Sequence, residues 1–131
     1  MLVKDIMTSS ILSVTPQDSF EKIRFIMKSE DIGALPVCDN QNHILGIITD
    51  RDLILRYFDG CVAEDLMTKS PITVRCDEDI HDAALKFSKH KVRRLPVLEG
   101  ERIAGMLSLK DLSKKKVLTS EIGHIIYNIC Q

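Results

Sequence analysis

The sequence predicts an α+β fold made of two pseudo-symmetric repeats, each with the element order β-α-β-β-α and packed sheet to sheet. Three observations favour this fold. The chain repeats itself over most of its length, the offset shrinks by only one residue along the way, and each copy places a helix-period pattern between short apolar strands. The matched segments are 3–8 with 63–68, 35–37 with 95–97, and 44–49 with 103–108.

Each repeat is expected to begin with a short helix followed by a β-rich stretch. The helices are placed at 3–7 and 63–67, and the β-rich stretches at 11–14 and 72–74, where β-branched residues are frequent.

A longer helix and a hairpin follow in each repeat. Apolar residues recur at helical spacing in both copies, and turn-forming tips at 39–42 and 99–101 separate two apolar strands. The helical positions are Phe20, Ile23 and Met27 in the first copy and Ile80, Ala83, Ala84 and Phe87 in the second. The return strands are expected at 44–49 and 102–108, with a second helix beginning near Asp50 and near Lys110.

The domain organisation follows from the repeat. We expect a first motif at 1–60, a second at 61–113 and a C-terminal helical tail at 114–131. A half of this size buries too little surface to be stable alone, so both motifs should form one cooperative domain. The tail carries apolar residues at helical spacing, which fits a helix packed on the domain or on a second subunit, namely Ile122, Ile125, Ile126 and Ile129.

Composition limits the class of protein. Hydrophobic residues make up 44% and charged residues 28% of the 131 residues, which fits a folded core, and the net charge of −1 favours neither nucleic acid nor an anionic membrane. No apolar run is long enough to span a membrane, and residues 1–5 do not resemble a secretory signal. We therefore expect a cytoplasmic protein without a membrane or nucleic-acid partner.

The four cysteines do not suggest a disulfide framework or a metal site. They are irregularly spaced, form no C-x-x-C pair, and lie at no ligand spacing with the four histidines. Reduced thiols are the expectation for Cys38, Cys61, Cys76 and Cys130.

These repeats resemble the CBS-domain family, whose members occur as tandem pairs called Bateman modules. The resemblance covers nearly all of 1–113, and indicates a stand-alone CBS domain-containing protein. The segments that carry it are Asp5-Ile6-Met7-Thr8, Leu35-Pro36-Val37 and Gly46-Ile47-Ile48-Thr49-Asp50-Arg51-Asp52, with second copies at 65–68, 94–97 and 105–111.

The element Gly-h-h-Thr/Ser-x-x-Asp, where h is a hydrophobic residue and x any residue, occurs at 46–52 and 105–111. It lies where a strand ends and a helix begins. Backbone N–H groups are unpaired there, and the positive helix end favours an anion. The carboxylate of Asp52 or Asp111 could accept both hydroxyls of a ribose, while Thr49 or Ser108 faces a phosphate or ribose oxygen. The alternative is an ordinary capping box that only starts the helix.

The resemblance implies that adenosyl ligands bind in clefts between the two copies: AMP, ADP, ATP or S-adenosylmethionine as a regulatory ligand, with no cofactor required. Each cleft should draw on both copies. One is expected to contain Ile47, Thr49 and Asp52 with Pro71, Ile72, Arg93 and Lys110. The other is expected to contain Met106, Ser108 and Asp111 with Ile11, Leu12, Gly33 and Arg51.

The cations in these sets would face phosphate, since arginine binds it through a planar fork and lysine as a point charge. Arg93-Arg94 in the second copy stands where the first has Gly33-Ala34, so the clefts should differ in charge.

Catalysis is not expected, because the chain carries no recognised catalytic motif. Two roles remain open. The chain either senses an adenosyl ligand and passes the occupancy to an unidentified target protein in trans, or it serves as a ligand-free interaction and dimerisation module. A homodimer is expected in either case, because four-helix dimers are usual in the resembled family.

Overall fold

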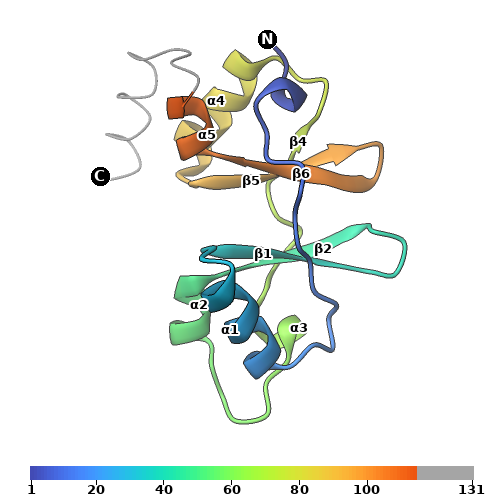
Figure 1. Ribbon diagram of the computed structural model, residues 1–131, viewed down its shortest axis with the longest axis vertical. Coiled ribbons are helices and arrows are strands. Elements are labelled where there is room, and N and C mark those ends of the chain that lie inside the picture. The colour runs from blue at the N-terminus through green and yellow to red at the C-terminus, as the bar shows by residue number, and fades with distance from the viewer. Residues whose placement is uncertain (115–131) are drawn as a thin grey trace. The chain divides into compact units, whose positions relative to one another are not determined.

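A computed structural model describes residues 1–114 and divides the chain into two compact units (Figure 1). Unit 1 comprises Met1–Ile11 and Ile72–Gln131, and unit 2 comprises Leu12–Pro71. The expected tail helix at 115–131 lies outside the described residues. The fold is mixed α+β, as the sequence predicted, and has two three-stranded sheets.

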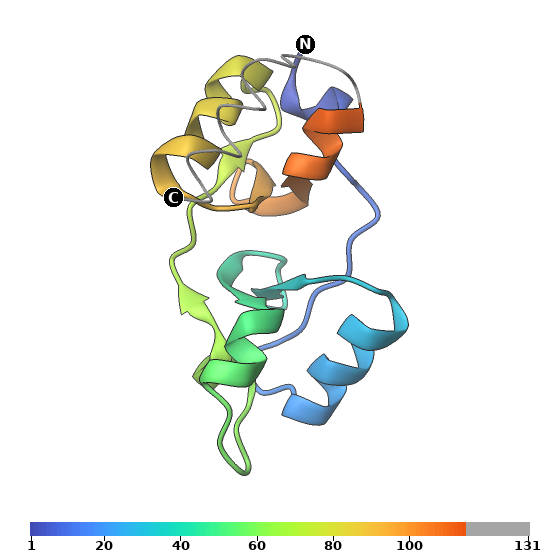
Figure 2. The same cartoon turned by 90° about the vertical axis from the view of Figure 1, so that its left-hand side faces the viewer.

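Unit 2 is an antiparallel sheet with its helices on one face (Figures 1 and 2). The strand order is β1-β2-β3, and both pairs are antiparallel. The elements are α1 (Phe20–Ser29), β1 (Ala34–Cys38), β2 (Ile44–Thr49), α2 (Asp50–Leu55), α3 (Ala63–Leu66) and β3 (Thr68–Lys69).

Unit 1 has the same layering, with strand order β4-β5-β6. Here β4 pairs with β5 in parallel, and β5 pairs with β6 antiparallel. The elements are the 3-10 helix η1 (Val3–Asp5), β4 (Val74–Arg75), α4 (Ile80–His90), β5 (Arg94–Glu99), β6 (Arg102–Ser108) and α5 (Leu109–Lys114).

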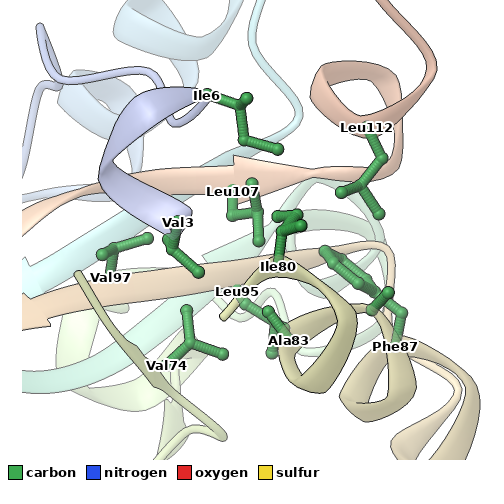
Figure 3. Packing of buried hydrophobic residues seen from close by; sticks show 11 residues of the cluster. Val3, Ile6, Val74, Ile80, Ala83, Phe87, Leu95, Val97, Leu107 and Leu112 are labelled. Atoms are coloured by element: carbon green, nitrogen blue, oxygen red, sulfur yellow. The ribbon is translucent and has the colours of Figure 1, made fainter. Parts of the chain in front are cut away.

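The two longer helices follow the sequence pattern. The Ser19 side chain accepts from the Lys22 amide at the start of α1, and the Asp79 side chain accepts from the His81 amide at the start of α4. The predicted core positions are buried except Phe20, which is partly buried. Figure 3 shows α4 of unit 1 turning Ile80, Ala83 and Phe87 toward the sheet residues Leu95 and Leu107.

The leading segment of each sequence repeat, at 3–7 or 63–67, packs in the unit that is formed mainly by the other repeat. We call this the exchange of leading segments. Val3 and Ile6 of the first copy are buried in the core of unit 1, whose other elements come from the second copy (Figure 3). Ala63 and Leu66 of the second copy are buried in the core of unit 2. The Val3 amide donates to the Glu78 carbonyl (2.9 Å), and the Ala63 amide likewise donates to the Asp18 carbonyl (2.9 Å). Sequence repeat and compact unit therefore do not coincide.

The leading β stretches are shorter than the sequence suggested. Val14 makes only an isolated parallel bridge to Val37, and β4 has two residues. The Val14 amide donates to the Pro36 carbonyl (3.0 Å), and the Cys38 amide donates to the Val14 carbonyl (2.8 Å). Extending that ladder toward residue 12 would need an N–H group on Pro36, which proline lacks. In unit 1, Pro96 of β5 likewise has no N–H group to extend the pairing of β4 toward residue 72.

In the part of the chain that the structure describes, no helix has both the length and the apolar character needed to cross a bilayer.

Candidate functional site

The strand-to-helix junction of unit 2 is built around Thr49 and Asp52. Strand β2 runs directly into α2, and Thr49 is the N-cap residue in extended conformation. Its backbone N–H donates to Asp52 Oδ2 (2.8 Å), its hydroxyl donates to the same oxygen (3.0 Å), and its Oγ1 accepts from the Asp52 amide (3.3 Å). The carboxylate is thereby held in one orientation.

Unit 1 repeats this geometry at the start of α5. The Ser108 amide donates to Asp111 Oδ2 (2.9 Å), and the Asp111 amide donates to Ser108 Oγ (3.1 Å). Both junctions therefore form the reciprocal cap that was the alternative to ligand binding. Capping uses one carboxylate oxygen, Oδ2, in each unit. The partners of the other oxygen, Oδ1, therefore determine which further interactions the carboxylate makes.

That second oxygen has a different partner in each unit. Asp52 Oδ1 lies 3.5 Å from Arg56 Nε, and Arg56 also donates through Nη1 to the Met67 carbonyl (3.2 Å). Asp111 Oδ1 instead accepts from the Thr8 hydroxyl (3.4 Å). Sequence reasoning missed Arg56 and Thr8. The first could have been found as an i, i+4 ion pair, whereas nothing local connects Thr8 with a residue so distant in the chain.

The motif glycines allow a neighbouring segment of the same unit to approach the return strand. A Cβ added to Gly105 would stand 2.6 Å from the Thr8 carbonyl oxygen, and one added to Gly46 would stand 2.8 Å from that of Thr68. Thr8 pairs with Met106, exchanging two backbone hydrogen bonds of 2.9 Å. The glycines thus place the Met-Thr segments of the motif beside the junctions.

The residues before β1 and β5 also reach the junctions. The Asp50 amide donates to the Gly33 carbonyl (2.9 Å), and the Leu109 amide donates to the Arg93 carbonyl (3.2 Å). Arg94 pairs directly with Ser108 across β5 and β6, whereas the corresponding partner of Thr49 is Ala34. Cross-strand partners project from the same face, so unit 1 carries an extra cation beside its junction.

The remaining predicted residues lie on or beside the elements of the junctions, or where the chain passes between the units. Within unit 2 the structure brings Gly33, Ile47 and Arg51 to the strands and helix that hold Asp52, and within unit 1 it brings Arg93, Met106 and Lys110 to those that hold Asp111. Arg51 and Lys110 are exposed, and Ile47 and Met106 are partly buried. Ile11 and Leu12, like Pro71 and Ile72, stand where the chain passes from one unit to the other. The grouping of these residues into clefts shared by both copies stays a prediction.

Cys38, Cys61 and Cys76 are free thiols, and burial raises the pKa of Cys38. Cys130 lies outside the described residues. Across residues 1–114 no group of three or more His, Cys, Asp or Glu side chains is arranged to hold a metal ion.

Comparison with known protein families gives two matches to the CBS domain, at residues 3–59 and 62–117. The chain is similar to the CBS domain-containing protein YhcV of Bacillus subtilis, with 29% identity over 132 residues, covering 97% of this chain and 94% of that protein. It is also 28% identical over 113 residues to the inosine-5'-monophosphate dehydrogenase of Methanocaldococcus jannaschii, but that match covers only 23% of the dehydrogenase.

Two solved structures with bound ligands have the same fold. CBSX2 in complex with AMP matches with a TM-score of 0.83 and 28% identity, covering 91% of this chain and 98% of CBSX2. The CBS domain pair of protein MJ0100, in complex with 5'-methylthioadenosine and S-adenosyl-L-methionine, matches with a TM-score of 0.75 and 30% identity, covering 88% and 95%.

Proposed function

Because the chain belongs to the CBS domain family, we propose that it is a regulatory module that binds adenosyl ligands and passes their occupancy to another protein. The observation that carries this proposal is the duplicated junction. Both units hold a fixed carboxylate at the end of the return strand, and relatives with this fold are seen with AMP or with S-adenosyl-L-methionine.

The ribose hydroxyls would be recognised by Asp52 in one site and Asp111 in the other. Each carboxylate keeps acceptor capacity on Oδ1, because an ionised carboxylate offers about four lone-pair positions and capping occupies Oδ2. The phosphate would be recognised by cations. In the predicted sets Arg93 and Lys110 serve the Asp52 site and Arg51 serves the Asp111 site, and Arg94, which pairs with Ser108, adds a cation beside the Asp111 junction.

Signalling requires that the ligand bind one arrangement of the chain more tightly than another. We infer that each cleft combines residues of both copies, as in the predicted sets, and that the copies act as one cooperative domain. The occupied state would be read by a target protein in trans. The free thiols of the described residues fit a reducing compartment, and we place the protein in the cytoplasm.

A homodimer is part of the proposal. Apolar side chains on α1 and α2 are exposed, with Phe25 at 69%, Ile54 at 80% and Leu55 at 66% of their full accessibility. Covering them with the same face of a second copy would remove apolar surface from water.

These exposed residues also favour the second candidate function, a ligand-free interaction and dimerisation module. In that case the two junctions would serve only to start α2 and α5, a role that their reciprocal hydrogen bonds already fulfil.

Calorimetric titration distinguishes the two functions. We expect the full chain to bind at least one compound from a panel of adenosine, AMP, ADP, ATP and S-adenosylmethionine. Asp52→Asn and Asp111→Asn should each weaken one binding event by about ten- to a hundredfold, the effect of losing a hydrogen bond to a charged group. Asparagine is preferable to alanine here because its amide oxygen can still accept the capping N–H bond.

The matched controls are Glu21→Gln on α1 and Asp82→Asn on α4, exposed acids in the first turn of their helices. They should leave affinity unchanged. No binding of any compound at millimolar concentration would favour the interaction module, and turnover of a compound in the same samples would indicate an enzyme.

A further inference from the structure

We propose that Arg56 sets the ligand charge preference of the Asp52 site, allowing that site to accept phosphate-bearing adenosyl ligands. Arg56 lies outside the motif segment that runs from Gly46 to Asp52. The inference rests on the proposed function, since it concerns which adenosyl ligands the site takes.

The guanidinium of Arg56 is held at two points. Nε lies 3.5 Å from Asp52 Oδ1, and Nη1 donates to the Met67 carbonyl at 3.2 Å. Residue 56 also caps α2, with its amide donating to the Asp52 carbonyl (2.9 Å). These contacts fix a positive charge beside the carboxylate, at the end of α2 and next to the segment that leads into β3.

Neutralisation is effective here because the Asp52 side chain is largely shielded from water. It is 14% exposed, whereas Arg56 is 48% exposed. A shielded carboxylate is screened less by solvent and salt than an exposed one, so without its cation it would repel a phosphate bound at the same junction. A neutral ribose would feel no such repulsion.

Within unit 2 itself Arg56 has few alternatives, because Arg93 and Lys110, which the proposed cleft would add to the Asp52 site, belong to unit 1. The positions corresponding to Arg93 and Arg94 are Gly33 and Ala34, and Asp50 adds a further negative charge at the start of α2. Arg51, the remaining cation of that helix, is exposed as Arg56 is, but the described contact with the Asp52 carboxylate is made by Arg56. Arg56 is therefore the cation that the structure holds against the Asp52 carboxylate.

The contact has no described counterpart at the other junction. Asp111 Oδ1 accepts from the Thr8 hydroxyl, which is neutral, and the residue aligned with Arg56 in the second copy, Lys115, lies outside the described residues. Removing Arg56 would take a charge from the Asp52 junction, whereas removing Thr8 would take a neutral hydroxyl from the Asp111 junction.

The test compares AMP with adenosine in the full chain carrying Asp111→Asn, which leaves the Asp52 site as the one under study. Adding Arg56→Gln should weaken AMP binding by about tenfold while changing adenosine affinity by less than about twofold, as expected for one uncompensated charge near a doubly charged phosphate. Arg56→Lys should restore most of the AMP affinity, because it restores the charge. The AMP loss should shrink as salt is raised.

Arg24→Gln on α1 is the matched control, since it removes the same charge from an exposed position of the same unit. The inference is overturned if Arg56→Gln weakens adenosine and AMP equally, if Arg24→Gln has the same effect, or if lysine at position 56 does not rescue. Failure of the unmodified chain to bind either compound would contradict the proposed function itself, and the inference with it.

Discussion

Replacing Leu66 by alanine tests the exchange of leading segments. Leu66 belongs to α3 of the second sequence repeat, yet it is fully buried in the core of unit 2 with Ile23 and Ile48. Removing a buried leucine side chain costs about 2–5 kcal/mol, because apolar contacts are lost and the cavity closes only partly. A domain of this size is typically stable by about 5–15 kcal/mol, so the effect is large.

Urea denaturation of the full chain measures this loss. The free energy of unfolding should fall by about 2–5 kcal/mol, while its dependence on urea concentration (the m-value) should stay unchanged. The control Leu85→Ala removes a leucine that is 65% exposed on α4, and should change stability by less than about 0.5 kcal/mol.

A double-mutant cycle then locates α3. Leu66→Ala should be non-additive with Ile23→Val, with a coupling of about 0.5–3 kcal/mol, because both residues belong to one core. It should be additive with Ile80→Val, which lies in the core of unit 1. Coupling to Ile80 in place of Ile23, or a cost for Leu66→Ala below about 1 kcal/mol, would refute the assignment of α3 to unit 2.

Three further predictions concern the rest of the chain. Gly105→Ala should destabilise the protein by about 1–3 kcal/mol, because its Cβ would meet the Thr8 carbonyl at 2.6 Å, and an unchanged melting temperature would contradict that contact. The Thr15 amide donates to Asp18 Oδ2 (2.8 Å) and is the main cause of the lowered pKa of the Asp18 carboxyl. Asp18→Asn removes the charge that this bond stabilises, so it should lower the free energy of unfolding by about 1–2 kcal/mol at neutral pH. Since the folded pKa is depressed, that stabilisation is present above the unfolded value of 3.8 and is lost as pH falls through the folded pKa. A stability difference between wild type and variant that does not shrink as pH is lowered below 3.8 would contradict this. Light scattering should find a dimer that Phe25→Lys converts to a monomer, and a wild-type monomer at micromolar concentration would argue against the proposed dimer.

Most of the fold follows from local sequence patterns. The return strands at 44–49 and 102–108 have the predicted bounds, and α1 and α4 bury the predicted stripe because helical spacing leaves one apolar face. The second helices begin at or next to the predicted residues, because Thr49 and Ser108 provide the oxygen that starts them.

The exchange of leading segments could not be predicted from the repeat. Val3 and Ile6 occupy the same positions of their copy as Ala63 and Leu66 do of theirs, so both are apolar at the same spacing. Packing each segment on its own copy or on the other one satisfies the same hydrophobic pattern. Only long-range contacts distinguish the two arrangements, and a periodic pattern carries no information about them.

The site was predictable in its residue types and less so in its partners. The duplicated motif and its family resemblance predict Thr49 and Asp52 as site residues, and the structure shows their side chains in contact. The contact between Thr8 and Asp111 depends on where the leading segment packs. It could not be predicted from the sequence because the exchange of leading segments could not be predicted either. The grouping of both copies into shared clefts stays a prediction.

A nuclear magnetic resonance titration of the full chain with AMP tests directly whether an adenosyl ligand binds at the two junctions. Ligand binding at the two junctions should shift the amide signals of residues 49–52 and 108–111, together with those of Gly33 and Arg93, whose carbonyls accept from the first amides of α2 and α5. The hairpin tips at 39–42 and 99–101 should stay unchanged. Shifts confined to the tips, or no shift at either junction up to millimolar AMP, would contradict adenosyl-ligand binding at the junctions.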